Sequence, residues 1–270
     1  MTDRSEAFRA MHVKGAPFVM PNPWDLGSTR ILEQLGFRAL ATTSAGLAFS
    51  LGRRDAEGAV SREEAIAHAG LIAAATDLPV NGDLENGFGA SAEDCAETVR
   101  QAAAVGLAGC SIEDTTGQAG DPIFAFDHAV ARVRAAAEAA QAAGGLVLTA
   151  RAENFLYGRR DIDDTIRRLR AFAEAGADVL YAPGLRDMES VRAVIGAVDR
   201  PVNVLASPSL TVGQIAEAGA ARISLGSAFA LNALRGLIGA AEEVLQRGTF
   251  GFAAAKPGYA EISEMMKGRE

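Results

Sequence analysis

The segment LPVNGDLENGFGASAEDCAETVRQAAAVGLAGCSIED, residues 78–114, contains one complete strand–helix–strand unit. Its two ends, 78–85 and 108–114, are short apolar runs that finish in carboxylates, as expected of buried parallel strands. Between them SAED (91–94) has the form of a helix N-cap box. The Ala-rich stretch 92–105 then carries polar residues at helical intervals, so the segment predicts a β–α–β unit.

The same unit repeats along the chain, with a helix-like stretch in most gaps between strand candidates. The predicted strands are 17–22, 38–44, 78–85, 108–114, 145–153, 177–183, 200–206 and 221–226. The predicted helices are 62–76, 92–105, 127–143, 161–175, 187–197, 211–218 and 227–247, with Gly106, Gly144, Gly176 and Gly219 at or just past helix ends.

Eight such units predict an α/β fold, a single (β/α)8 TIM-type barrel over residues 1–270. Residues 248–270 are expected to form a C-terminal extension with an extra helix. The barrel is preferred because the units follow one another without a long crossover. A doubly wound eight-stranded sheet is the alternative fold.

Composition narrows the class of protein. Hydrophobic residues make up 49% of the 270 residues, the formal net charge is −8, and no basic stripe stands out. Nucleic acid is therefore not an expected partner. No secretory signal or uninterrupted apolar run of membrane-spanning length is visible, and Cys95 and Cys110 are expected to be free thiols. We expect a cytoplasmic protein without a membrane partner.

Carboxylates gather at the predicted carboxyl ends of neighbouring strands. Asp83 and Glu85 end the third strand, Glu113 ends the fourth, and Asp55 lies in the loop after the second. These ends meet at one rim of a barrel, where the acids would repel one another. A bound Mg²⁺ or Mn²⁺ would remove that conflict, since hard cations prefer oxygen ligands. The alternative is that the acids are ordinary loop residues or helix N-caps.

Two further features of the same rim suit an anionic substrate. Arg151 lies just past an apolar strand, where a guanidinium would bind a substrate carboxylate, or form a structural ion pair with Glu153 or Glu113. The small residues Ser44-Ala45-Gly46 predict a turn whose backbone N–H groups could hold a carboxylate, or that allows close packing. The three histidines, His12, His68 and His128, are expected to have surface or structural roles.

With these residues in view, the chain resembles the isocitrate lyase and phosphoenolpyruvate mutase superfamily over about residues 17–250. The most specific pieces are GDLENGFG (82–89) followed by SIED (111–114). The other matching pieces are TTSAG (42–46), SLGRRD (50–55), LTARAENF (148–155), ADVLYAPG (177–184) and PVNVLA (201–206).

The resemblance implies a barrel whose eighth helix is swapped with a neighbour in a homodimer or homotetramer. It implies a site that binds a small carboxylate substrate and Mg²⁺. In that site Asp83 would be the direct metal ligand, and Asp55, Glu85 and Glu113 would hold the metal's waters. Ser44, Ala45 and Gly46 would form a backbone cradle for the substrate carboxylate, Arg151 would hold the substrate, and Asn203 would contact it.

The departures from the family pattern concern the acid–base groups. Lyases of this superfamily carry a Lys-Lys/Arg-Cys-Gly-His loop after the fourth strand, and the phosphonate branch has a Thr-Asn-Ser gate. Here the loop reads DTTGQAGDPIFAFD (114–127), with no Lys, Cys or His before His128. Tyr181 stands after the sixth strand, where relatives have Glu or His. Arg151, Glu113 and Tyr181 remain as the candidate catalytic residues.

Three functions are compatible with this pattern. The first is a Mg²⁺-dependent lyase that cleaves a C–C bond, or decarboxylates, beside the oxo group of a small 2-oxo acid or related carboxylate, through a stabilised enolate. Decarboxylation needs no dedicated base, and Tyr181 or water could supply the final proton. The second is a phosphonate mutase or hydrolase that acts on phosphonopyruvate. The third is a carboxylate-binding barrel that has lost its chemistry.

Overall fold

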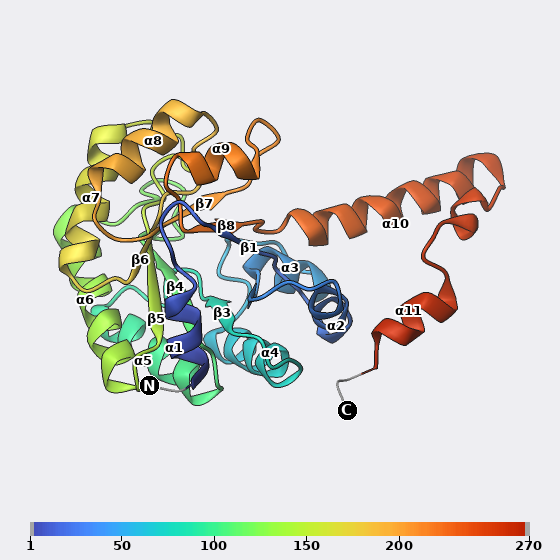
Figure 1. The fold of residues 1–270 in the computed structure, drawn as a ribbon, viewed down its shortest axis with the longest axis horizontal. Coiled ribbons are helices and arrows are strands. Elements are labelled where there is room, and N and C mark those ends of the chain that lie inside the picture. Colours follow the sequence, from blue (N-terminus) through green and yellow to red (C-terminus); the bar gives the residue numbers. More distant parts are fainter. Residues whose placement is uncertain (1–2, 268–270) are drawn as a thin grey trace.

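Eight parallel strands form a nearly closed barrel in the computed structural model, which describes residues 3–267 (Figure 1). From β2 to β8 each strand pairs with the next one in the sequence, and β1 pairs with β8. Between β1 and β2 the backbone N–H of Ala41 donates to the carbonyl of Pro21 over 3.0 Å. The strands are β1 Phe18–Met20, β2 Leu40–Ala41, β3 Val80–Asp83, β4 Gly109–Glu113, β5 Val147–Arg151, β6 Val179–Tyr181, β7 Val202–Leu205 and β8 Arg222–Ser224.

This order confirms the predicted barrel and excludes the doubly wound alternative, in which the strand order reverses at a switch point. All eight predicted strands are present, each shorter than its sequence range. The helices are α1 Asp3–Ala10, α2 Leu26–Gln34, α3 Ser44–Ser50, α4 Arg62–Ala74, α5 Ala92–Ala104, α6 Phe126–Ala142, α7 Ile162–Glu174, α8 Met188–Ala197, α9 Val212–Glu217, α10 Ala228–Arg247 and α11 Tyr259–Met265, with a 3₁₀ turn η1 at Gly251–Ala254.

The predicted helices are confirmed, while α1, α2 and α3 were not predicted. The four expected terminal glycines, Gly106, Gly144, Gly176 and Gly219, all have positive φ. The turn predicted at Ser44-Ala45-Gly46 is wrong, because these residues form the first turn of α3. Thr43 caps that helix, and its hydroxyl accepts the N–H of Gly46 over 3.2 Å.

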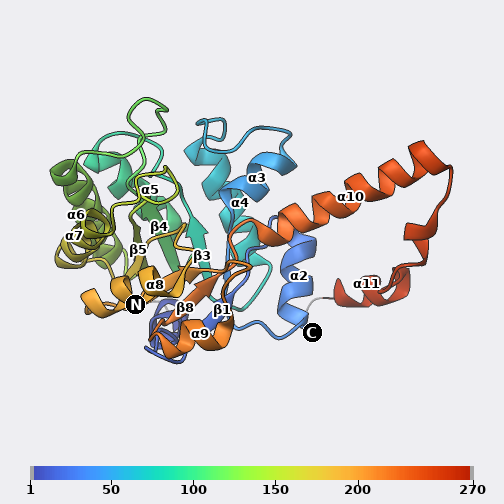
Figure 2. The same cartoon turned by 90° about the horizontal axis from the view of Figure 1, so that it is seen from above.

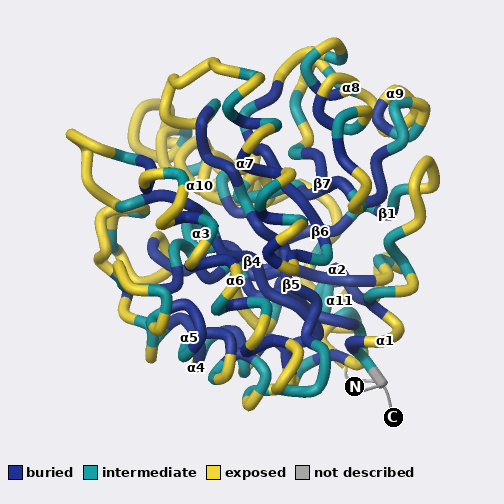
Figure 3. Tube along the Cα trace, turned by 90° about the vertical axis from the view of Figure 1, so that its left-hand side faces the viewer, coloured by how far each residue is buried: buried dark blue, intermediate teal, exposed yellow. Residues whose placement is uncertain are grey.

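Apolar side chains fill the amino-terminal end of the barrel interior, which leaves the carboxyl-terminal end for polar groups. An apolar cluster inside the barrel contains Phe8, Phe18, Met20, Ala39, Ala41, Ala108, Val147 and Val179. Helix α1 contributes Phe8, which is 0% exposed, and thereby closes the bottom. A larger cluster fills the space between the strands and the outer helices, and burial is deepest along the strands (Figure 3).

The long helix α10 projects away from the barrel, and α11 turns back toward α2 (Figures 1 and 2). The extra helix predicted in the extension 248–270 is therefore confirmed as α11. Leu237, Ile238 and Leu245 of α10 are 66%, 56% and 85% exposed. Such a series of large apolar side chains on one element is typical of a surface that a partner covers.

None of the helices in the described part of the chain combines the length and the apolar character that crossing a bilayer requires.

Candidate functional site

A cavity of about 380 Å³ opens at the carboxyl-terminal end of the strands. Polar and charged side chains line it from the six strands β3 to β8 and from the segments that follow β1 and β2. They include Asn22, Thr42, Thr43, Ser44, Asp55, Asn81, Asp83, Ser111, Arg151, Tyr181, Asn203, Arg222 and Ser224. This is the rim at which barrel enzymes bind their substrates.

Asp83, the last residue of β3, lies at the centre of the polar contacts. One carboxylate oxygen, Oδ1, accepts from Arg151 over 2.9 Å, and the other, Oδ2, accepts the backbone N–H of Ser44 over 3.1 Å. Its own N–H donates to the hydroxyl of Thr42 over 2.8 Å. The ends of β2, β3 and β5 are therefore joined through one carboxylate.

Arg151 holds three carboxylates at once. Its guanidinium lies 2.9 Å from Asp83, 2.9 Å from Glu113 and 2.8 Å from Glu153, and its side chain is only 15% exposed. The ion pairs with Glu113 and Glu153, predicted as an alternative to substrate binding, are both present. Arg151 also lines the cavity, so the two interpretations are compatible.

The other acids of the predicted metal set are Asp55, Glu85 and Glu113. Their negative charges, with that of Asp83, exceed the single positive charge of Arg151. Burial, then the charge of Asp83, raises the pKa of Asp55. Burial, then Asp83 and Asp55, raises the pKa of Glu85 to about 7. Burial raises the pKa of Glu113 well above its ordinary value, despite Arg151. Mutual repulsion of this kind is what a bound cation relieves, and the donors are all oxygens.

The four acids divide between two adjoining hollows. Asp55 and Asp83 line the main cavity, whereas Glu85 and Glu113 line a second hollow of about 480 Å³ together with Tyr157. Within residues 3–267, no three or more His, Cys, Asp or Glu side chains are already gathered as ligands. Of the four acids, Asp55 and Asp83 therefore face the main cavity, and Asp83 is the one bound directly to Arg151.

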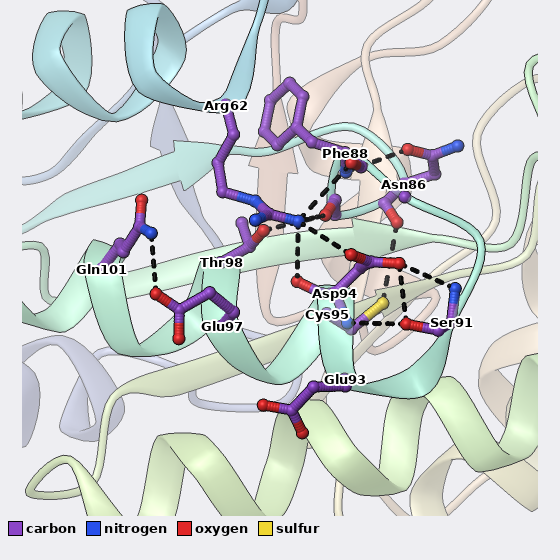
Figure 4. Close-up of polar contacts among 12 residues, drawn as sticks. Arg62, Asn86, Phe88, Ser91, Glu93, Asp94, Cys95, Glu97, Thr98 and Gln101 are labelled. Carbon is purple, nitrogen blue, oxygen red and sulfur yellow. Dashed lines mark hydrogen bonds and ion pairs between the residues drawn. The ribbon is translucent and has the colours of Figure 1, made fainter.

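The loop after β3, which carries Glu85, has an unusual backbone and is supported by hydrogen bonds from α4. Glu85, Gly87 and Phe88 all have positive φ, at 46°, 81° and 57°. Arg62 of α4 donates to the carbonyl of Gly87 and to Asp94, each over 3.3 Å (Figure 4). These contacts secure an unusual backbone that non-glycine residues rarely adopt, so the position of Glu85 is set by packing beneath the rim.

The remaining predicted residues lie at the cavity wall, with one exception. Ser44, Ala45, Tyr181 and Asn203 line the cavity. Gly46 does not: its N–H is bonded to Thr43, and an added Cβ would lie 2.8 Å from Cβ of Trp24. The glycine is thus explained by close packing, the alternative given for this stretch.

Tyr181 is 6% exposed, with Arg151 5.2 Å from its ring centroid. Burial raises the pKa of its hydroxyl, so Tyr181 stays protonated at neutral pH and can donate a hydrogen bond or a proton.

The loop 114–127 is ordered by a bridge between Thr115 and Ile123. It places no Lys, Cys or His at the cavity.

The histidines have structural partners, as predicted. His68 contacts the carbonyl of Trp24 over 2.9 Å, and His128 contacts that of Ala90 over 2.8 Å.

Several cavity residues were not predicted from the sequence, among them Asn22, Asn81, Ser111 and Arg222. The available signal was a polar residue inside an otherwise apolar strand, since alternate strand positions face the barrel interior.

Comparison with known proteins agrees with this geometry. The family model for phosphoenolpyruvate phosphomutase matches residues 8–245. A solved structure from Burkholderia cenocepacia J2315, provisionally assigned as a lyase/mutase, is 48% identical with a TM-score of 0.92, covering 97% of this chain and 94% of that one.

Two curated relatives carry specific activities in their names. The oxaloacetate decarboxylase of Paraburkholderia xenovorans is 32% identical over 196 residues, which cover 70% of this chain and 64% of that protein. The 2-methylisocitrate lyase of Escherichia coli K12 is 28% identical over 251 residues, which cover 88% of this chain and 82% of that protein. The superfamily resemblance found in the sequence is confirmed.

The raised pKa of Glu85 predicts a pH-dependent stability. With EDTA present, the folded chain binds a proton at Glu85 more tightly than the unfolded chain does, between the ordinary value of 4.5 and about 7. The contribution of Glu85 to the free energy of unfolding is therefore fully present below pH 4.5 and is lost as pH rises through about 7. Urea unfolding should show this fall in the wild type and a flatter profile in Glu85→Gln.

A matched control is Glu138→Gln, at an exposed position of α6. It should leave the wild-type pH profile unchanged. Identical pH profiles for the wild type and Glu85→Gln would show that Glu85 does not experience the repulsion described here.

Proposed function

This chain belongs to the phosphoenolpyruvate phosphomutase family, and we propose that it is a divalent-metal-dependent lyase that acts on a small 2-oxo acid or related carboxylate. The bond cleaved would join the leaving group to the carbon adjacent to the oxo-bearing carbon, so that its electrons pass to the oxo group as an enolate. One observation carries the proposal: Asp83 and Arg151 meet at 2.9 Å on the wall of the open cavity, amid acids whose charges are not balanced. The named lyase and decarboxylase relatives support the same class of reaction.

The metal would be held by Asp83, with Asp55, Glu85 and Glu113 around it. A bound Mg²⁺ or Mn²⁺ would supply the positive charge that polarises the oxo group and withdraws electrons from the bond being cleaved. The set fits because every donor is a carboxylate oxygen and because burial and mutual repulsion raise three of the four pKa values.

Arg151 and the start of α3 would bind the oxo-acid end of the substrate. The guanidinium can hold a carboxylate through two parallel N–H donors, and the protein's own acids already orient it. Ser44 and Ala45 line the same cavity at the amino-terminal end of α3, where backbone N–H groups favour anions. Negative charge that develops on the oxo group would meet positive groups on two sides.

The missing Lys and Cys in the loop 114–127 favour a cleavage that needs little base assistance. In a decarboxylation, the electrons of the broken C–C bond pass to the oxo group as CO₂ leaves, and the resulting enolate later takes a proton at carbon. Tyr181 is protonated and lines the cavity, so it would be that proton donor, with water as the alternative source.

Substrate turnover tests the proposal. Purified protein with Mg²⁺ should turn over at least one of oxaloacetate, 2-methylisocitrate and phosphonopyruvate above a metal-only control. Phosphate release from phosphonopyruvate would identify phosphonate chemistry. In Asp83→Asn the rate should fall at least about 100-fold, because the proposed metal ligand loses its charge.

The matched control is Asp77→Asn, whose side chain is 77% exposed and pairs with Arg4. It should keep wild-type activity. A wild type that binds these acids without product formation would indicate a binding protein. Full activity in Asp83→Asn would remove Asp83 from the site.

We also propose that the chain forms a homodimer or homotetramer in which α10 packs on a neighbouring barrel. The exposed apolar side chains of α10 and its projection from the barrel support this arrangement. Most of the stability of a helix comes from packing of its apolar face, so a helix of 20 residues that projects from the barrel would be stabilised by a partner that covers this face.

Light scattering tests the assembly. The wild type should have two or four times the chain mass of 28.0 kDa. The double change Leu237→Glu and Leu245→Glu should lower that mass, because it places charges in the covered face. Leu71→Glu, at a 60% exposed position of α4, is the control and should not. A wild-type mass of one chain would contradict the arrangement.

A further inference from the structure

Arg222 is a buried cation at the floor of the cavity. It is the first residue of β8, its exposure is 1%, and it lines the same cavity as Asp83 and Arg151. The apolar cluster around Phe8 and Phe18 lies on the amino-terminal side and closes the barrel there. The guanidinium is therefore enclosed on every side except that of the cavity.

No carboxylate balances this charge within the described part of the chain. One terminal nitrogen of Arg222 donates to the hydroxyl of Thr149 over 3.0 Å, and the other contacts Nε2 of His12 over 3.2 Å. Nε is buried and has no hydrogen-bond partner. Burial lowers the pKa of Arg222 to about 9, so it remains protonated at neutral pH.

The histidine partner is neutral and accepts from the arginine. Nδ1 of His12 lies 2.9 Å from the carbonyl of Phe8, which can only accept, so Nδ1 carries the proton. Nε2 is then left with a lone pair toward Arg222. Burial, followed by the charge of Arg222, lowers the pKa of His12 to about 3. The positive charge of Arg222 is thus solvated by a hydroxyl and an imidazole alone.

The other buried arginines are satisfied differently. Arg168 pairs with Asp114 and Asp164 at 3.0 and 2.9 Å. Arg132 binds backbone carbonyls, including that of Gly89 at 2.8 Å, and neither arginine lines the cavity. A buried charge without a counter-charge is costly, and of the three buried arginines in the described residues, Arg222 is the one that lines the cavity.

Strand register relates Arg222 to Arg151, the arginine proposed to bind the oxo-acid end of the substrate. Arg151 pairs with Tyr181, Tyr181 with Asn203, and Asn203 with Arg222 across β5, β6, β7 and β8. All four residues line the cavity. One row of the barrel wall therefore has a guanidinium at each end and two polar side chains between them.

We propose that Arg222 is a specificity-determining residue that binds a second carboxylate of the substrate, at the end opposite the oxo-acid group. The proposal rests on the lyase function above and narrows its substrate to a dianion. Two of the five N–H groups of Arg222 are directed at Thr149 and His12, so three remain to bind the oxygens of a carboxylate.

The charge of Arg222 also favours one type of cleavage. A cation that binds a carboxylate in the ground state holds it more tightly than it would hold neutral CO₂, so it slows the loss of that group. The carboxylate on Arg222 is therefore one that the product keeps.

Calorimetry with a matched pair of stable ligands tests the role. 2-Oxoglutarate and 2-oxopentanoate have the same carbon chain, and only the former ends in a second carboxylate. With Mg²⁺ present, the wild type should prefer 2-oxoglutarate by about 100-fold, a typical loss when a buried charge is left unpaired. Arg222→Met should reduce the preference to about threefold or less, and Arg222→Lys should keep most of it.

Oxalate, which lacks a remote carboxylate, is the control ligand. Its affinity should be the same in the wild type and in both variants. No preference in the wild type, an undiminished preference in Arg222→Met, or an equal weakening of all three ligands would overturn the role. If Arg222→Met does not fold, the role is still tested, because a wild type without the preference would overturn it and Arg222→Lys should keep most of it. An Arg222-dependent preference without any turnover would refute the proposed reaction and leave the second carboxylate site standing.

Discussion

The ion pairs of Arg151 with Asp83, Glu113 and Glu153 are the constraint on which the site depends. They join three neighbouring strands at the point where each strand ends, at distances of 2.8 to 2.9 Å. Breaking such a buried set by removing one partner is strongly destabilising, because the others are left uncompensated. The same set leaves acids in excess, and it is this excess that fits a divalent cation.

The barrel makes this arrangement possible by closing at one end and opening at the other. Phe8 of α1 and the small residues Ala39, Ala41 and Ala108 fill the amino-terminal end. Charged groups can then be concentrated at the carboxyl-terminal end without contact with that core. The loop after β3 adds Glu85 on a strained backbone that Arg62 supports from below.

The sequence predicted the strands well because buried parallel strands are apolar runs of limited length, and most of them are followed here by a capped helix. It missed α2 because its cap is Asp25 with Ser28, rather than the Ser-x-x-Glu form. It mistook the start of α3 for a turn, since Ser44-Ala45-Gly46 has the composition of both, and only the Thr43 cap distinguishes them.

Site prediction was limited by contacts that local sequence does not encode. The acids and Arg151 could be named because strand ends converge in a barrel, but the pairing of Arg151 with Asp83, 68 positions earlier, depends on closure. Arg222 gave only the signal of a charge within a strand, and its direction became clear from register with Asn203.

The most direct measurement is a crystal structure with Mg²⁺ and oxalate. The account predicts a magnesium ion with a carboxylate oxygen of Asp83 at about 2.1 Å, and oxalate in contact with Arg151. A site that stays without the ion, with Asp83 still bound only to Arg151, would contradict it.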